Sequence, residues 1–137
     1  MSKATILFID DMALIRELIA TALTSKGYTV RLAGNAREAL EAVRGRLPDL
    51  VLLEPTTCGG DGLRFLKVLR ANALYSGIPV MVLTGVADRK LVIATARLGV
   101  QDYILKCRSS LKELVERIER CARGDASPEG REGKPVR

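Results

Sequence analysis

Histidine and tryptophan are both absent from the 137-residue sequence. Without histidine, the chain cannot build a Ser-His-Asp or Cys-His triad, a histidine metal site or a phosphohistidine relay of its own. Aromatic residues make up only 4% of the chain, so few side chains are available to stack on nucleic acid bases. These absences exclude many common catalytic arrangements and argue against binding of single-stranded nucleic acid.

Cysteines and long hydrophobic runs are also scarce. Cys58, Cys107 and Cys121 form no C-x-x-C pair, which is typical of a reducing compartment and argues against disulfides or a zinc site. The longest apolar runs are about six residues, whereas a membrane-spanning helix needs about 18. The N-terminus lacks the apolar stretch and cleavage site of a signal peptide. We therefore expect a cytoplasmic protein without a membrane segment.

The composition is that of one globular domain. Hydrophobic residues make up 47% and charged residues 28% of the chain, with a net charge of +6. Residues 124–137 differ, because they contain three Gly and two Pro, and Val136 is their only large apolar residue. We expect a folded domain over residues 1–123 and a disordered tail or linker stub over residues 124–137.

Short apolar runs of strand length recur along the chain. They are Ala4–Ile9, Tyr28–Ala33, Leu50–Leu53, Pro79–Leu83 and Gln101–Leu105. Most are nearly continuous in apolar residues, as in strands buried on both faces of a parallel sheet. The run Tyr28–Ala33 alternates more, because it contains Thr29 and Arg31, and it is predicted to be an edge strand.

Amphipathic helical patterns lie between the predicted strands. In the first, apolar residues follow the spacing of one helix face, at Ile15, Leu18, Ile19, Ala22 and Leu23. Capping signals open three later helices, at Asn35 with Glu38, at Asp88, and at Ser110 with Glu113. The third helix is expected to end near Gly77 and Pro79.

Five strand-then-helix units in a row predict an α/β fold with a doubly wound, five-stranded parallel sheet and five helices. Five such units suit the strand order 2-1-3-4-5. In that order, the ligand crevice lies outside the C-terminal ends of the first and third strands.

Carboxylates follow these two strands. Asp10 and Asp11 come directly after the first strand, and Glu54 directly after the third, so three carboxylates are expected to share the crevice. They would repel one another without a cation, and oxygen ligands of this kind suit Mg²⁺. The alternative is that the two aspartates only cap the first helix.

A hydroxyl and an ammonium lie at the same edge of the predicted sheet. Thr84 ends the fourth strand and Lys106 ends the fifth. Beside a group of acids, such a pair is suited to holding a phosphoryl group. The alternatives are a turn-initiating threonine and a charge-balancing lysine.

The ordered motifs resemble the receiver domain of bacterial two-component response regulators over about residues 4–123. They are Ile9-Asp10-Asp11, residues 48–54, Asp61-Gly62, Val82-Leu83-Thr84-Gly85 and residues 102–106. The resemblance implies a flavodoxin-like fold and a conformational switch. In that family, a histidine kinase's phosphoryl group moves to an aspartate after the third strand, with Mg²⁺ bound beside it.

The resemblance also implies a role for each matching residue. The implied metal ligands are Asp10, Asp11, Glu54 and the backbone carbonyl of Thr56, and the implied switch and phosphate-pocket residues are Thr84, Tyr103 and Lys106. Tyr103 corresponds to the aromatic residue that reorients during switching.

The chain departs from the family at the phosphoacceptor position, where Glu54 replaces the aspartate. Its carboxylate lies one methylene further out, which spoils the geometry for in-line attack. The longer side chain is expected to pair with Lys106 and accept a hydrogen bond from Thr84. A single charge mimics a phosphoryl dianion only in part. Cys58 and Cys107 also stand where the family usually has proline.

We therefore expect a receiver-like signalling module, atypical at Glu54, that is not an enzyme and is not switched by aspartyl phosphorylation. It would act as a monomer or weak homodimer, through the face formed by the fourth helix, fifth strand and fifth helix. A histidine kinase or an output protein would be its partner, and Mg²⁺ would bind weakly.

Two alternatives remain open. The chain could accept a phosphoryl group on Glu54 or on a hydroxyl at Thr56 or Thr57. It could also bind nucleic acid through two basic stripes, although we expect these to be solvated helix faces. The stripes are Arg64, Lys67 and Arg70, and Arg117, Arg120 and Arg123.

Overall fold

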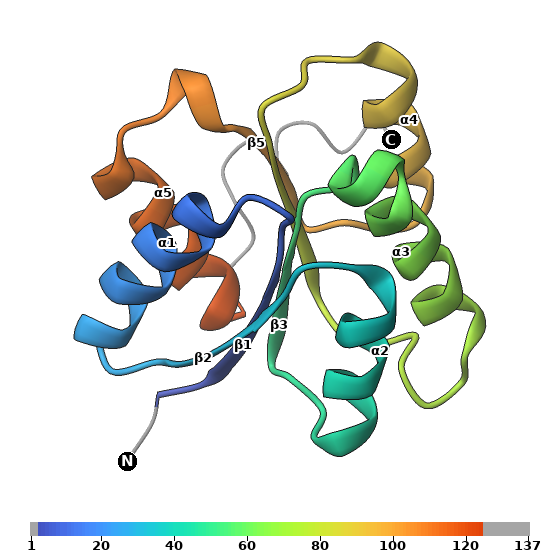
Figure 1. Cartoon of the computed structure of the whole chain (residues 1–137), viewed down its shortest axis with the longest axis horizontal. Helices are drawn as coiled ribbons and strands as arrows, with labels where there is room; N and C mark the ends of the chain where they lie inside the picture. The colour runs from blue at the N-terminus through green and yellow to red at the C-terminus, as the bar shows by residue number, and fades with distance from the viewer. Residues whose placement is uncertain (1–2, 125–137) are drawn as a thin grey trace.

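A five-stranded parallel sheet forms the centre of the computed structural model, which describes residues 3–124 (Figure 1). The strands are β1 (Thr5–Ile9), β2 (Thr29–Ala33), β3 (Leu50–Leu53), β4 (Val80–Thr84) and β5 (Asp102–Leu105). They lie in the order β2-β1-β3-β4-β5, and every neighbouring pair is parallel. The predicted fold class and strand order are confirmed. The predicted tail lies outside the described residues, apart from Gly124.

Helices cover both faces of the sheet. They are α1 (Ala13–Ser25), α2 (Ala36–Gly45), α3 (Asp61–Ala71), α4 (Arg89–Arg97) and α5 (Leu111–Ala122), with short 3-10 turns η1 (Thr57–Gly59) and η2 (Lys106–Arg108). In Figure 1, α1 and α5 lie on one side of the sheet, and α2, α3 and α4 lie on the other. The alternation of strands with right-handed helical crossovers produces this three-layer arrangement.

Two hydrophobic cores lie on opposite faces of the sheet. Ile6 and Phe8 of β1 belong to the core beneath α1 and α5, while Leu7 and Ile9 belong to the core beneath α2 and α3. Successive residues of a strand point to opposite faces, so a strand covered on both sides must be apolar throughout. The predicted edge position of β2 is confirmed. Its exposed residues are Thr29 and Leu32, whereas Arg31 is half-buried, so the burial does not follow the alternation of the sequence.

Two of the three predicted helix caps are confirmed without change. The Asp88 side chain accepts from the backbone of Lys90 and Leu91, and Ser110 with Glu113 forms a capping box. Asn35 caps α2 by accepting from the Glu38 N–H, as predicted. Glu38 Oε1 accepts from the Gly34 N–H and not from Asn35, so Asn35 and Glu38 do not form the expected reciprocal capping box.

Helix α3 ends at Ala71, earlier than the stop predicted near Gly77 and Pro79. The next residue, Asn72, has an extended backbone, and its side chain accepts from the Leu74 N–H at 2.8 Å. Asparagine side chains compete with helical hydrogen bonds in this way, which explains the earlier end.

The register of the sheet gathers the predicted site residues at one edge. Ile9 pairs with Leu53, and Thr84 pairs with Leu105, so the residues after β1, β3, β4 and β5 emerge together. Gly62 allows α3 to begin close to this edge, because a Cβ atom there would lie 2.2 Å from the Glu54 carbonyl oxygen.

Candidate functional site

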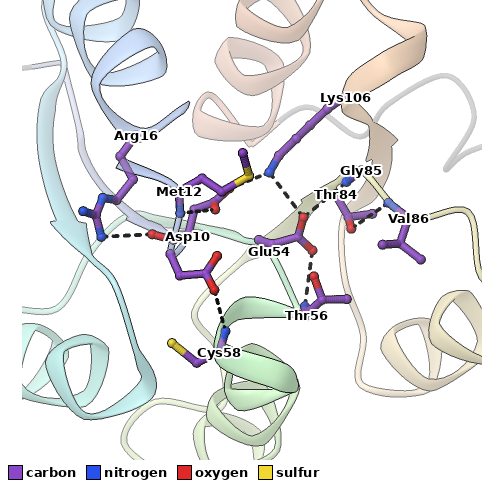
Figure 2. A network of polar contacts seen from close by, with 11 residues as sticks. Asp10, Met12, Arg16, Glu54, Thr56, Cys58, Thr84, Gly85, Val86 and Lys106 are labelled. Carbon is purple, nitrogen blue, oxygen red and sulfur yellow. Dashed lines mark hydrogen bonds and ion pairs between the residues drawn. The ribbon is translucent and has the colours of Figure 1, made fainter. Parts of the chain in front are cut away.

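The Lys106 side chain lies between two buried carboxylates at the C-terminal edge of the sheet (Figure 2). Its Nζ atom is 2.5 Å from Asp10 Oδ2 and 3.2 Å from Glu54 Oε1. The Asp10 side chain is fully buried and the Glu54 side chain is 7% exposed. The expected Glu54–Lys106 contact is therefore confirmed, and Lys106 also pairs with Asp10.

Backbone donors complete the surroundings of the Glu54 carboxylate. Oε1 accepts from the Gly85 N–H and Oε2 accepts from the Thr56 N–H, both at 3.2 Å. These donors come from the loops after β4 and β3, and Figure 2 shows them converging on the carboxylate from two sides. Convergent N–H groups and an ammonium form an oxyanion-binding arrangement, which the chain's own carboxylate fills.

Thr84 is buried at the end of β4, but it does not donate to Glu54. Its hydroxyl oxygen accepts from the Val86 N–H at 3.2 Å, which stabilises the turn after the strand. The predicted Thr84–Glu54 hydrogen bond is therefore wrong, and the Gly85 N–H occupies that position.

Tyr103 connects β5 to the same loop, because its hydroxyl donates to the Val86 carbonyl oxygen at 2.9 Å. Burial raises the pKa of Tyr103 to about 12, with further contributions from the negative charges of Glu54 and Asp88. The phenol thus remains a hydrogen-bond donor at neutral pH. Glu54 and Tyr103 hold adjacent residues of the loop, at Gly85 and Val86.

The two predicted acidic ligands point in different directions. Asp10 Oδ1 accepts from the Met12 N–H at 2.9 Å, which forms a turn before α1. The N-cap residue of α1 is Met12, so the alternative in which Asp10 caps this helix is wrong. Asp11 is exposed, and its Oδ2 accepts from the Cys58 N–H at 2.9 Å. Cys58 has a φ of 49°, a left-handed conformation that β-carbons disfavour, and this bond helps to hold it there.

The donor set does not fit Mg²⁺ in this arrangement. Lys106 already forms ion pairs with Asp10 and Glu54, and the Thr56 carbonyl oxygen accepts from the Gly59 N–H. Across residues 3–124, no three His, Cys, Asp or Glu side chains gather as a metal-binding group. The assignment of Asp10, Asp11, Glu54 and Thr56 as ligands stays a prediction.

The two hydroxyls considered as alternative phosphoacceptors have opposite accessibilities. Thr57 is fully buried, and its Oγ1 atom has no hydrogen-bond partner among the described residues. A phosphoryl donor cannot reach this buried hydroxyl, so Thr57 is excluded as a phosphoacceptor in this structure. Thr56 is exposed.

The two predicted basic stripes are interrupted by internal contacts. Arg70 donates to backbone carbonyl oxygens of Leu98, Ser76, Ile78 and Gly99. Arg117 forms two hydrogen bonds with Asp102, at 2.7 and 3.0 Å. Both guanidinium groups are therefore structural, which weakens the nucleic-acid hypothesis.

Sequence reasoning missed the backbone hydrogen-bonding groups of the site. The N–H groups of Gly85 and Thr56 bind Glu54, and the Val86 carbonyl binds Tyr103. Backbone donors and acceptors are the same in nearly every residue, so the sequence does not show which of them will bind a side chain. The only indication in the sequence was that these loops follow strand ends at the predicted site.

A family model described as the response regulator receiver domain matches residues 6–119. The DNA-binding response regulator MtrA of Mycobacterium tuberculosis is 38% identical over 127 residues, covering 92% of this chain and 54% of MtrA. The phosphate regulon regulatory protein PhoB of Pseudomonas aeruginosa is 37% identical over 115 residues, covering 84% of this chain and 50% of PhoB. The chain thus spans about half the length of these relatives.

Solved structures of receivers share the fold. A putative response regulator from Chloroflexus aurantiacus has a TM-score of 0.78 and 31% identity, covering 88% of this chain and 98% of that one. The BeF3-activated N-terminal receiver domain of Klebsiella pneumoniae RstA has a TM-score of 0.76 and 29% identity, covering 87% and 98%. In the described part of the chain, no helix has the length and apolarity needed to cross a membrane.

Proposed function

The chain belongs to the response regulator receiver domain family of two-component systems, and on that premise we propose that it is a binding module whose phosphoryl pocket holds its own Glu54 carboxylate. It acts through protein–protein contact, is not an enzyme, and is not switched by aspartyl phosphorylation. We place it in the cytoplasm.

The observation that carries this proposal is the set of donors around Glu54. The carboxylate accepts from Lys106 Nζ and from the N–H groups of Gly85 and Thr56, each at 3.2 Å. Without the Glu54 carboxylate, these groups would be free to donate hydrogen bonds to the oxygens of an incoming phosphoryl group. Glu54 carries about one negative charge, against the 1.5 to 2 of a phosphoryl group, so it reproduces the phosphorylated state in part.

The same contacts link the pocket to a candidate partner surface. Glu54 accepts a hydrogen bond from the Gly85 N–H, and the Tyr103 hydroxyl donates to the Val86 carbonyl oxygen. These two bonds restrain the loop before α4 from both sides. Beside it, Val86, Val92 and Ile93 are 38, 39 and 41% exposed. We assign the face of α4, β5 and α5 to a protein partner, either a histidine kinase or an output protein.

Receiver domains as a family bind Mg²⁺ at the phosphorylation site. For this chain we propose only weak Mg²⁺ binding, because the ion must compete with the Lys106 ammonium for Asp10 and Glu54. No step of the proposed function depends on the metal.

Phosphoryl labelling tests the proposal. The protein is incubated with acetyl phosphate and Mg²⁺, and intact mass is measured for the wild type, Glu54→Asp and Glu54→Gln. We expect an adduct only for Glu54→Asp, because the shorter side chain restores the attack geometry. A stoichiometric adduct on the wild type that disappears in Glu54→Gln would overturn the proposal.

The exposed hydroxyl of Thr56 supports one second candidate, a receiver that accepts phosphoryl groups beside Glu54. In the same experiment this function predicts a wild-type adduct that persists in Glu54→Gln and disappears in Thr56→Val.

A further inference from the structure

A hollow of about 450 Å³ lies at the N-terminal edge of the sheet, at the opposite end of β4 and β5 from the Glu54 pocket. Pro79 directly precedes β4 and Gln101 directly precedes β5, and both residues line the hollow. The connections from α3 to β4 and from α4 to β5 therefore form its walls. Its volume is within the range of roughly 300–1,000 Å³ that is typical of small-molecule sites.

Arg70 of α3 forms a cationic wall of this hollow. Its Nε and Nη2 atoms donate to the carbonyl oxygens of Leu98 and Gly99, at 2.6 and 3.2 Å, where α4 has ended. Its Nη1 atom donates to the carbonyl oxygens of Ser76 and Ile78, at 3.1 and 2.8 Å. Carbonyl oxygens at the C-terminus of a helix repel anions, but here a guanidinium group covers them. This end of the sheet is therefore positive instead of negative.

No carboxylate balances the charge of Arg70 in the described part of the chain. Its side chain is half-buried, and burial lowers its pKa, with no neighbouring negative charge to oppose this effect. Across residues 3–124, neither Arg70 nor Arg97 belongs to an ion pair, and no Asp or Glu lines the hollow. Carbonyl oxygens satisfy the N–H groups of Arg70 but carry no net charge, whereas buried charges in proteins are normally paired. An anion in the hollow would supply the missing charge.

We propose that this hollow binds a small phosphate monoester. Arg97, exposed in the last turn of α4, lines the hollow and can donate two parallel hydrogen bonds to phosphate oxygens. Arg70 supplies a second positive charge that its four carbonyl contacts hold in place. A phosphate monoester carries about 1.5–2 negative charges at pH 7, which matches two guanidinium groups better than the single charge of a carboxylate.

The organic part of the ligand has an apolar wall to pack against, because Ile78 and Leu98 also line the hollow. The hollow shares no residue with the Glu54 pocket or with the exposed apolar residues beside Val86. This inference therefore does not depend on the proposed function.

An NMR titration with phenyl phosphate locates the site on the intact chain. We expect the backbone amide signals of Gly77, Gly99 and Gln101 to shift and to reach saturation. The signal of Gly85, which binds Glu54 at the other end of the sheet, should stay unchanged. If about 10 mM phenyl phosphate leaves the first three signals in place, or moves only that of Gly85, the proposal is overturned.

Two arginine variants test the role of charge in this site. Arg97→Gln should raise the Kd for phenyl phosphate about tenfold, because it removes a charge-assisted contact. Arg89→Gln is the matched control, since Arg89 is also exposed on α4 but lies at its first residue, outside the hollow. Equal Kd values for the two variants would contradict the proposal.

A second probe tests the preference for a phosphate monoester. Benzoate has the same ring as phenyl phosphate but a single negative charge, so we expect it to bind at least about tenfold more weakly. Benzoate that binds as tightly as phenyl phosphate would overturn the assignment of the ligand class.

Discussion

Lys106 Nζ lies 3.2 Å from Glu54 Oε1, although the two residues are 52 positions apart in the sequence. The same ammonium also contacts Asp10 Oδ2, so one cation compensates two buried carboxylates. A buried charge that loses its partner is costly, because no water replaces the lost contact. The contact therefore couples the stability of the domain to the arrangement of its pocket.

The first prediction concerns the energetic coupling of this pair. Lys106→Met should lower the free energy of unfolding by about 3–5 kcal/mol, because it leaves two carboxylates uncompensated. Glu54→Gln should cost about 1–2 kcal/mol, because the amide oxygen still accepts hydrogen bonds. Denaturant unfolding of both variants and of the double variant measures the coupling. We expect the double variant to cost less than the sum, and strict additivity would show that the contact has no energetic role.

The second prediction concerns Mg²⁺. Calorimetric titration should show weak binding to the wild type and affinity about tenfold higher for Lys106→Met, because the competing ammonium is gone. Arg108→Met removes an equal charge at a nearby exposed position and should leave the affinity unchanged. Glu54→Asp should also bind more tightly, and Asp11→Ala more weakly. Equal affinity in the wild type and Lys106→Met would refute competition by the lysine.

The third prediction concerns the alkaline titration of Tyr103. Its pKa is raised from 10.0 to about 12, so the fold favours the protonated phenol. The stability that Tyr103 contributes is therefore complete below pH 10 and is lost as the pH rises towards 12. Glu54→Gln should lower this pKa, because it removes a nearby negative charge, although burial will keep the pKa above 10.

Tyrosinate absorbance measures this titration in a background with Tyr28→Phe and Tyr75→Phe, since Tyr28 also has a raised pKa. Glu41→Gln, which removes an exposed carboxylate from α2, is the control and should not change the curve. If Glu54→Gln behaves like this control, the electrostatic link between Glu54 and Tyr103 is absent.

The fourth prediction concerns Gly62. A Cβ atom there would lie 2.2 Å from the Glu54 carbonyl oxygen and 2.8 Å from Pro55 Cα. Gly62→Ala should therefore destabilise the domain by about 1–3 kcal/mol, because backbone atoms must move. At Gly77 nothing lies within 4 Å of the added atom, and Gly77→Ala should be nearly neutral. Equal thermal unfolding midpoints for the two variants would contradict the close approach.

Hydrophobic periodicity in the sequence was enough to predict the strands, their order and the edge at which the site lies. Parallel strands joined by right-handed crossovers must place their C-terminal ends at one edge. Asp10, Glu54, Thr84 and Lys106 each follow or end such a strand, so their proximity was predictable from sequence position. The Glu54–Lys106 contact was expected from the resemblance to receiver domains, which places Lys106 beside the phosphoacceptor position.

The tertiary structure alone decided which atoms are bonded within that edge. Glu54 accepts from the Gly85 N–H instead of the Thr84 hydroxyl, and Asp11 accepts from the Cys58 N–H. Arg70, predicted to lie on a solvated face, is bound to four backbone carbonyls. Every residue except proline carries the same backbone donor and acceptor, so a sequence pattern cannot show which of them will be close enough to bond. That choice depends on how loops far apart in the chain pack against one another.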